Sequence, residues 1–133
     1  MMLIDTSILV PIFRDRSGRR RDRFRKFLGG ADYMLSRFTQ IELLQGCASE
    51  PQRQVLNHYL EGQDYAELGP EGWAEAARIR FDLRRMGLNV RSILDCCIAQ
   101  VALDARLTLV HNDADFEAIG KVRELRTRRL DIQ

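Results

Sequence analysis

The chain of 133 residues lacks several features that mark whole classes of protein. No apolar stretch approaches the ~20 residues that a membrane-spanning helix needs, so no transmembrane segment is expected. No basic segment precedes the first apolar run, which argues against a signal peptide. Repeats, low-complexity segments and proline- or serine-rich linkers are also missing, so we expect a single domain over residues 1–133.

Cysteine is too sparse for a disulfide framework or a zinc site. The three cysteines include an adjacent pair, Cys96 and Cys97, and their spacing fits neither kind of site. We therefore expect reduced, buried thiols in a cytoplasmic protein.

Basic residues gather in two stretches that the net charge of +2 conceals. Residues 14–26 carry eight Arg or Lys against two Asp, and residues 121–129 of a basic C-terminal tail carry five against one. Many such runs are only solvated helix faces. Two of them on one small chain nevertheless suggest a polyanionic partner, because Lys and Arg neutralise phosphate charges.

Short apolar segments alternate with helical patterns along the chain. Strands are predicted over 2–4, 33–36, 65–68 and 107–110, with a fifth near Leu125. Helices are predicted from Thr6, over 19–28, 38–48, 51–60, 70–86 and 92–106, and from about residue 113. This alternation predicts an α/β fold with a parallel sheet and helices on both faces. Trp73 falls in the apolar spacing of the helix over 70–86 and is expected in the core.

Four acidic residues lie at or near the predicted helix starts: Asp5, Glu42, Asp95 and Asp113. Each has a structural alternative as a helix cap. Thr39 and Ser92 lie three residues before Glu42 and Asp95, which fits the capping box. Asp5 and Asp113 could be N-caps, which the helix dipole favours.

Taken together, the four acids point to a metal site. In a parallel sheet the helices that follow strands start at the carboxyl edge, so Asp5 and Asp113 should meet there if their strands are neighbours. Crowded carboxylates repel one another unless some are protonated or a divalent cation binds. Oxygen ligands suit Mg²⁺ or Mn²⁺. Asp115 is a further candidate, while Thr6, Ser7 and Asn112 could hold oxygens of the site or only shape the local turns.

Four segments of the sequence resemble the PIN-domain ribonucleases, in particular the VapC toxins of bacterial VapBC toxin–antitoxin pairs. They are "LIDTSILV" at residues 3–10, "IELLQG" around Glu42, "VRSILDCCIAQVAL" around Asp95 and "LTLVHNDADFEAI" around Asp113. Their order, spacing and context agree at all four acids, and the resemblance runs from Met1 to about Leu125.

The resemblance implies a three-layer α/β/α PIN-like domain with a central parallel sheet of about five strands. It also implies an Mg²⁺-dependent endoribonuclease toxin, a homodimer, and inhibition by a VapB-like antitoxin whose C-terminal tail enters the acidic groove. The substrate would be a tRNA, rRNA or mRNA, cleaved by metal-activated water. Chemistry and resemblance agree on the roles: Asp5 and Asp95 bind the metal, Asp113 completes the cage, and Glu42 orients or deprotonates the water.

Other functions remain open at this point. The chain could be a PIN-domain nuclease that processes RNA without being a toxin, or a non-catalytic RNA-binding module that uses only the basic stretches. A receiver domain or a carboxylate-nucleophile phosphatase also gathers acids at a sheet edge, but each would need a lysine beside the pocket. The two lysines, Lys26 and Lys121, do not directly follow predicted strands.

Overall fold

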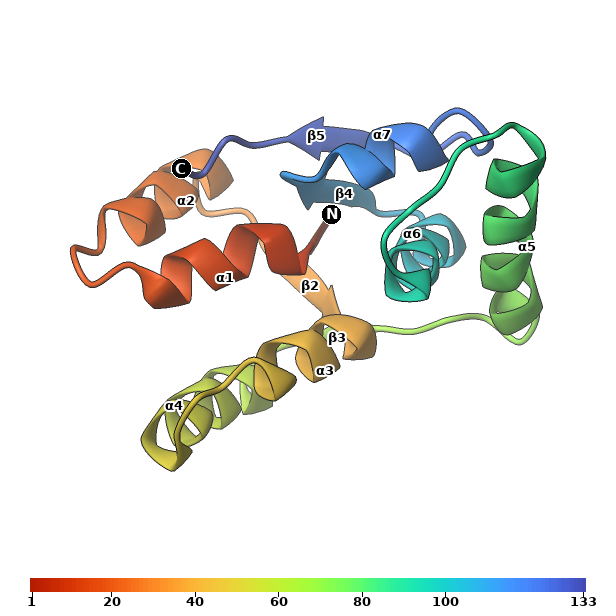
Figure 1. The fold of residues 1–133 in the computed structure, drawn as a ribbon. Coiled ribbons are helices and arrows are strands. Elements are labelled where there is room, and N and C mark those ends of the chain that lie inside the picture. The colour runs from red at the N-terminus through yellow and green to blue at the C-terminus, as the bar shows by residue number, and fades with distance from the viewer.

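A five-stranded parallel sheet lies between two layers of helices in the computed structural model, which describes residues 1–133 (Figure 1). The strand order is β3-β2-β1-β4-β5. The strands are β1 (Met2–Ile4), β2 (Tyr33–Ser36), β3 (Tyr65–Ala66), β4 (Thr108–His111) and β5 (Thr127–Arg129). The helices are α1 (Thr6–Arg14), α2 (Arg19–Leu28), α3 (Arg37–Gln45), α4 (Glu50–Glu61), α5 (Gly72–Arg85), α6 (Ile93–Ala105) and α7 (Ala114–Ile119). This confirms the predicted three-layer α/β/α fold.

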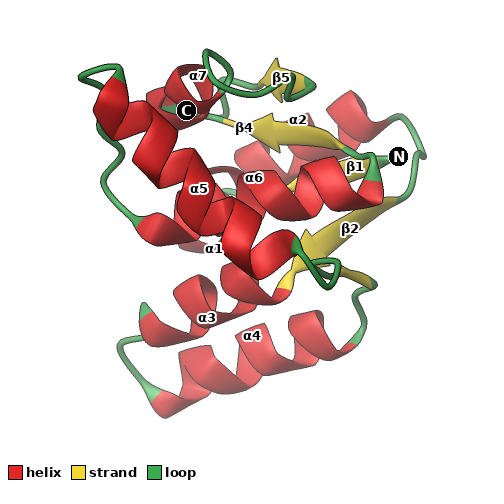
Figure 2. Ribbon diagram, turned by 90° about the vertical axis from the view of Figure 1, so that its right-hand side faces the viewer, coloured by secondary structure: helices red, strands yellow, loops and turns green.

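The two faces of the sheet are covered by different helices because side chains alternate along each strand. Leu3 and Leu109 point into a core formed with α5, α6 and α7. Ile4 and Val110, the next residue of each strand, point into a second core formed with α1, α2, α3 and α4. Figure 2 looks onto α5 and α6, with the strands behind them. None of the helices has both the length and the apolar character needed to cross a membrane.

Several predicted boundaries shift by a few residues. β3 ends at Ala66 rather than residue 68, and α5 begins at Gly72 rather than at Pro70. β5 begins at Thr127, slightly beyond the strand predicted near Leu125, and its three residues are exposed. An exposed edge strand carries no apolar alternation, so its position could not be read from the pattern.

The expectation that Trp73 lies in the core is wrong. Its side chain is 66% exposed and packs edge to face on Phe38, with ring centroids 5.8 Å apart. The buried stripe of α5 runs through Gly72, Ala76, Ile79 and Leu83. Trp73 follows the first residue of that stripe and is therefore rotated by about 100° away from the core.

The last residues of the chain lie against α2, where arginines of the first basic stretch bind them (Figure 1). The guanidinium of Arg20 donates to the carbonyl oxygen of Ile132 at 3.2 Å, and that of Arg23 donates to the carbonyl oxygen of Gln133 at 2.6 Å. Part of this positive charge therefore holds the chain terminus in place. The remaining arginines of α2 and β5 are exposed.

Candidate active site

The acidic residues converge where the strand order changes direction. β1 pairs with β2 on one side and with β4 on the other, so β1 and β4 are neighbours as the sequence argument required. The backbone N–H of Asp5 donates to the carbonyl oxygen of Val110 at 3.0 Å. The Ser7 hydroxyl accepts from the backbone N–H of Asn112 at 2.9 Å, which ties the start of α1 to the end of β4. This is the crevice where parallel α/β sheets bind ligands.

One carboxylate oxygen of Asp5 caps a helix, and the other has no hydrogen-bond partner. Its Oδ2 accepts from the backbone N–H of Ser7 at 2.9 Å, which caps α1. Its Oδ1 is buried and has no hydrogen-bond partner. Burial is the main cause that raises the pKa of Asp5 to about 6, against the lowering effect of the Ser7 hydrogen bonds. Since an unpaired buried carboxylate oxygen is costly, this atom fits a cation ligand better than a cap alone.

Glu42 faces the same crevice and is not a helix cap. The N-cap of α3 is Ser36, whose hydroxyl accepts from the backbone N–H of Thr39, so Glu42 lies in the second turn. Thr6 donates its hydroxyl proton to Glu42 Oε1 at 2.9 Å. Burial raises the pKa of Glu42 and the charge of Asp113 adds to this, while the Thr6 hydrogen bond lowers it. The hydroxyl of Thr6 therefore holds the Glu42 carboxylate in place.

Three further carboxylates form a compact group. Asp95 lies in the first turn of α6, Asp113 is the N-cap of α7, and Asp115 follows in α7. One oxygen from each of the three lies within 4.8 Å of the others. No hydrogen bond reaches the Asp95 carboxylate, and burial, together with the neighbouring acidic charges, raises its pKa to about 8. The capping-box alternative also fails for Asp95: Ser92 is the N-cap of α6, but its backbone N–H does not donate to the Asp95 carboxylate.

The residues fit a divalent cation by the chemistry of their donors. All are carboxylate oxygens, which suit Mg²⁺ and Mn²⁺. Of the two ligands expected from the sequence, Asp95 belongs to the compact group. Asp5 lies outside that group, but it is near enough for its charge to raise the pKa of Asp95. Asp115, a further candidate in the sequence, is a full member.

Arg91 is a site residue that the sequence did not reveal. It precedes the N-cap Ser92, and its guanidinium forms ion pairs with Asp113 at 3.1 Å and with Asp115 at 3.4 Å. The chain contains many arginines, and nothing in the spacing of Arg91 marks it. Only the approach of α7 to the start of α6 brings it to the acids.

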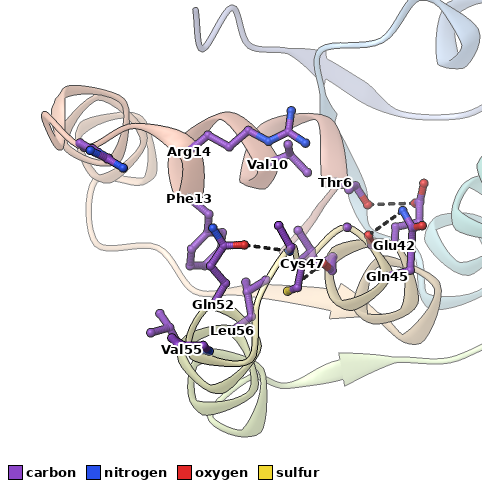
Figure 3. A pocket seen from close by; sticks show the side chains of 15 residues that line it. Thr6, Val10, Phe13, Arg14, Glu42, Gln45, Cys47, Gln52, Val55 and Leu56 are labelled. Atoms are coloured by element: carbon purple, nitrogen blue, oxygen red, sulfur yellow. Dashed lines mark hydrogen bonds between the residues drawn. The ribbon is translucent and has the colours of Figure 1, made fainter.

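A groove leads away from one side of the site (Figure 3). Its volume is about 690 Å³, and it is bounded by α1, α3 and α4. Thr6 and Glu42 lie at one end of it, and Arg14 lies away from that end. The apolar part of its lining includes Val10, Phe13, Leu43, Val55 and Leu56. Thr6 and Glu42 therefore connect the acidic site to a partly apolar groove.

Comparison with known proteins agrees with this fold. The family model of the PIN domain matches residues 2–122. Ribonuclease VapC11 of Mycobacterium tuberculosis is 31% identical over 128 residues, which cover 94% of this chain and 96% of the relative. Among solved structures, VapBC2 from Rickettsia felis, bound to a DNA fragment from its promoter, has a TM-score of 0.76 at 19% identity and covers 98% of each chain. VapBC-5 from Mycobacterium tuberculosis has a TM-score of 0.71 at 22% identity, covering 97% of this chain and 98% of the other. The chain therefore belongs to the PIN domain family, in its VapC ribonuclease group.

Proposed function

We propose that this chain is an Mg²⁺-dependent endoribonuclease that acts as the toxin of a type II toxin–antitoxin pair, with residues 1–133 as its single PIN-like domain. The observation that carries the proposal is that Asp5, Glu42, Asp95 and Asp113 lie near enough at the switch point of the sheet for their charges to act on one another, with a buried unpaired oxygen on Asp5. The ribonuclease relatives support the same activity.

We assign the catalytic roles from the chemistry of the four acids and from the family resemblance. Asp5 and Asp95 would hold Mg²⁺, or Mn²⁺ in its place, and Asp113 would complete the cage. The bound ion would acidify water and offset negative charge on the scissile phosphate. Glu42, held by Thr6, would orient the attacking water and accept its proton. Its raised pKa brings it closer to neutral pH, where a general base works best.

The exposed arginines of α2 are proposed to bind the RNA backbone. Arg20 holds the C-terminus, so the test uses Arg19 and Arg21, for which the structure shows no side-chain hydrogen bond to another residue. Replacing both with Ala should weaken RNA binding and lower its salt dependence by about two released counterions, while turnover at saturating RNA persists. The measurement is fluorescence anisotropy of a labelled RNA, in EDTA, at several salt concentrations. An unchanged salt slope would assign this face a different role.

The groove beside Glu42 supports binding of a protein inhibitor. An amphipathic segment of a VapB-like antitoxin could place apolar side chains between α1, α3 and α4 and extend its tail to the acidic site. We further propose a homodimer, as the resemblance implies. Apolar side chains that are exposed in the single chain, and that a second copy could cover, include Ile41, Trp73 and Phe81.

Expression in a bacterial host distinguishes a toxin from an RNA-processing nuclease and from a non-catalytic RNA-binding module. We expect induction of this chain to arrest growth and to produce cleaved cellular RNA, and co-expression of its antitoxin to restore growth. Asp95→Asn should be harmless at the same protein level. A nuclease that processes RNA would cut RNA without arresting growth, and a binding module would leave RNA intact. Either outcome would contradict the toxin proposal.

A further inference from the structure

Arg91 binds two of the three carboxylates of the compact acidic group. Its backbone N–H donates to Asp115 Oδ2 at 3.1 Å, and its guanidinium contacts both Asp113 and Asp115. These contacts join the loop before α6 to α7. A positive charge is thus already present where three carboxylate oxygens lie within 4.8 Å of one another.

The contacts of Arg91 engage two of the carboxylates that a divalent cation would need. Asp113 Oδ1 accepts from the backbone N–H of Asp115 at 2.9 Å, and its Oδ2 accepts from Arg91 at 3.1 Å. Asp115 Oδ2 accepts from Arg91 twice. A guanidinium and a divalent cation repel each other, so both cannot share these carboxylates at full strength.

Release of the guanidinium requires little rearrangement. The Arg91 side chain is 80% exposed, and exposed ion pairs of this kind are weak. The backbone N–H of Arg91 would still hold Asp115 after the side chain left, so the loop would keep its position. A freed guanidinium at the mouth of the site is well suited to a phosphate, which it can bind through two parallel hydrogen bonds.

We propose that Arg91 is a built-in counter-cation that neutralises Asp113 and Asp115 before the metal binds, yields them to the divalent cation, and then binds an RNA phosphate. The proposal rests on the proposed function, because it needs both a metal and an RNA at this site. It makes Arg91 a competitor of the metal and a ligand of the substrate. Removal of the Arg91 charge should therefore strengthen Mg²⁺ binding and weaken RNA binding.

The first test measures metal binding alone. Isothermal titration of Mg²⁺ into RNA-free protein should show roughly threefold to tenfold tighter binding for Arg91→Gln than for the unsubstituted chain. Arg91→Lys keeps the charge and should bind Mg²⁺ more weakly than Arg91→Gln. Arg53→Gln is the matched control, since Arg53 is exposed on α4 and loses the same charge elsewhere. It should bind Mg²⁺ like the unsubstituted chain.

The second test measures RNA cleavage at saturating Mg²⁺. Arg91→Gln should raise KM for RNA severalfold with a smaller change in kcat, and Arg91→Lys should recover part of the loss. Mg²⁺ binding by Arg91→Gln that is unchanged or weaker would overturn the proposal. A variant that weakens both affinities and melts earlier would show a purely structural role, which also overturns it. If the unsubstituted chain binds no Mg²⁺, the proposed function itself fails, and that result is distinct from the others.

Discussion

Asp5→Asn is expected to give a folded protein that no longer cleaves RNA. Asn caps helices about as well as Asp, so the hydrogen bond from Ser7 that starts α1 should persist. The substitution removes the negative charge that would hold the cation and leaves a site of nearly the same shape. We expect the cleavage rate to fall by more than about a hundredfold, which corresponds to about 3 kcal/mol of transition-state stabilisation. Asp95→Asn should behave in the same way.

The control for Asp5→Asn is Asp22→Asn on α2. Asp22 is exposed and its substitution makes the same change in charge outside the site. Cleavage of a labelled RNA and thermal melting should be measured on all three variants. Normal cleavage by folded Asp5→Asn would rule out its role as a metal ligand. If Asp5→Asn fails to fold, Asp95→Asn tests the same charge requirement, because its carboxylate accepts no hydrogen bond that the fold depends on.

The metal-free protein is expected to lose stability as the pH rises through neutrality. Burial raises the pKa of Asp5 to about 6 and that of Asp95 to about 8, both above the value of 3.8 for an exposed Asp. Between about pH 4 and pH 8 the folded chain therefore holds more protons than the unfolded chain. Its free energy of unfolding is largest at the acidic end of this window and falls as these two acids ionise.

Melting curves in EDTA test this pH dependence. We expect Tm to fall between about pH 5 and pH 8, and Asp95→Asn to remove most of the slope. Millimolar Mg²⁺ should raise Tm most at the alkaline end, because the cation binds the ionised carboxylates. A Tm that is independent of pH and of Mg²⁺ would contradict a shared acidic site. Asp22→Asn should retain the full slope.

Much of the fold follows from local patterns that the sequence shows directly. The apolar segments at 2–4 and 33–36 became β1 and β2 with unchanged bounds, and α2 ends at the predicted Leu28, followed by Gly29 in a left-handed conformation. The apolar pattern gave wrong predictions where tertiary contacts determine the position of a strand or the burial of a side chain. β5 has three exposed residues and no apolar pattern in its sequence, so only its pairing with β4 in the structure defines it as a strand. Trp73 is on the same helix as core residues, but it follows Gly72 by one residue and therefore lies outside the buried stripe.

The sequence predicted which acidic residues would come together, but it did not predict the ion pairs that Arg91 makes with them. Asp5 and Asp113 follow strands directly, so the rule for parallel sheets places them together once β1 and β4 are neighbours. Glu42 was a candidate from the sequence, but its spacing from Thr39 also fitted a capping box, and only the fold shows that Ser36 is the N-cap instead. Arg91 and its two ion pairs depend on how closely α7 approaches the loop before α6. No local pattern encodes that distance.

The most direct test of a divalent-cation site built from these acids is RNA cleavage by the purified chain with the metal removed and restored. A labelled RNA should be cut in millimolar Mg²⁺, remain intact when excess EDTA is present, and be cut again when Mg²⁺ is added beyond the EDTA. Mn²⁺ should also restore cleavage, since it accepts the same oxygen ligands. Cleavage that continues at the same rate in EDTA would contradict the central claim that Asp5, Asp95 and Asp113 hold a catalytic metal beside Glu42.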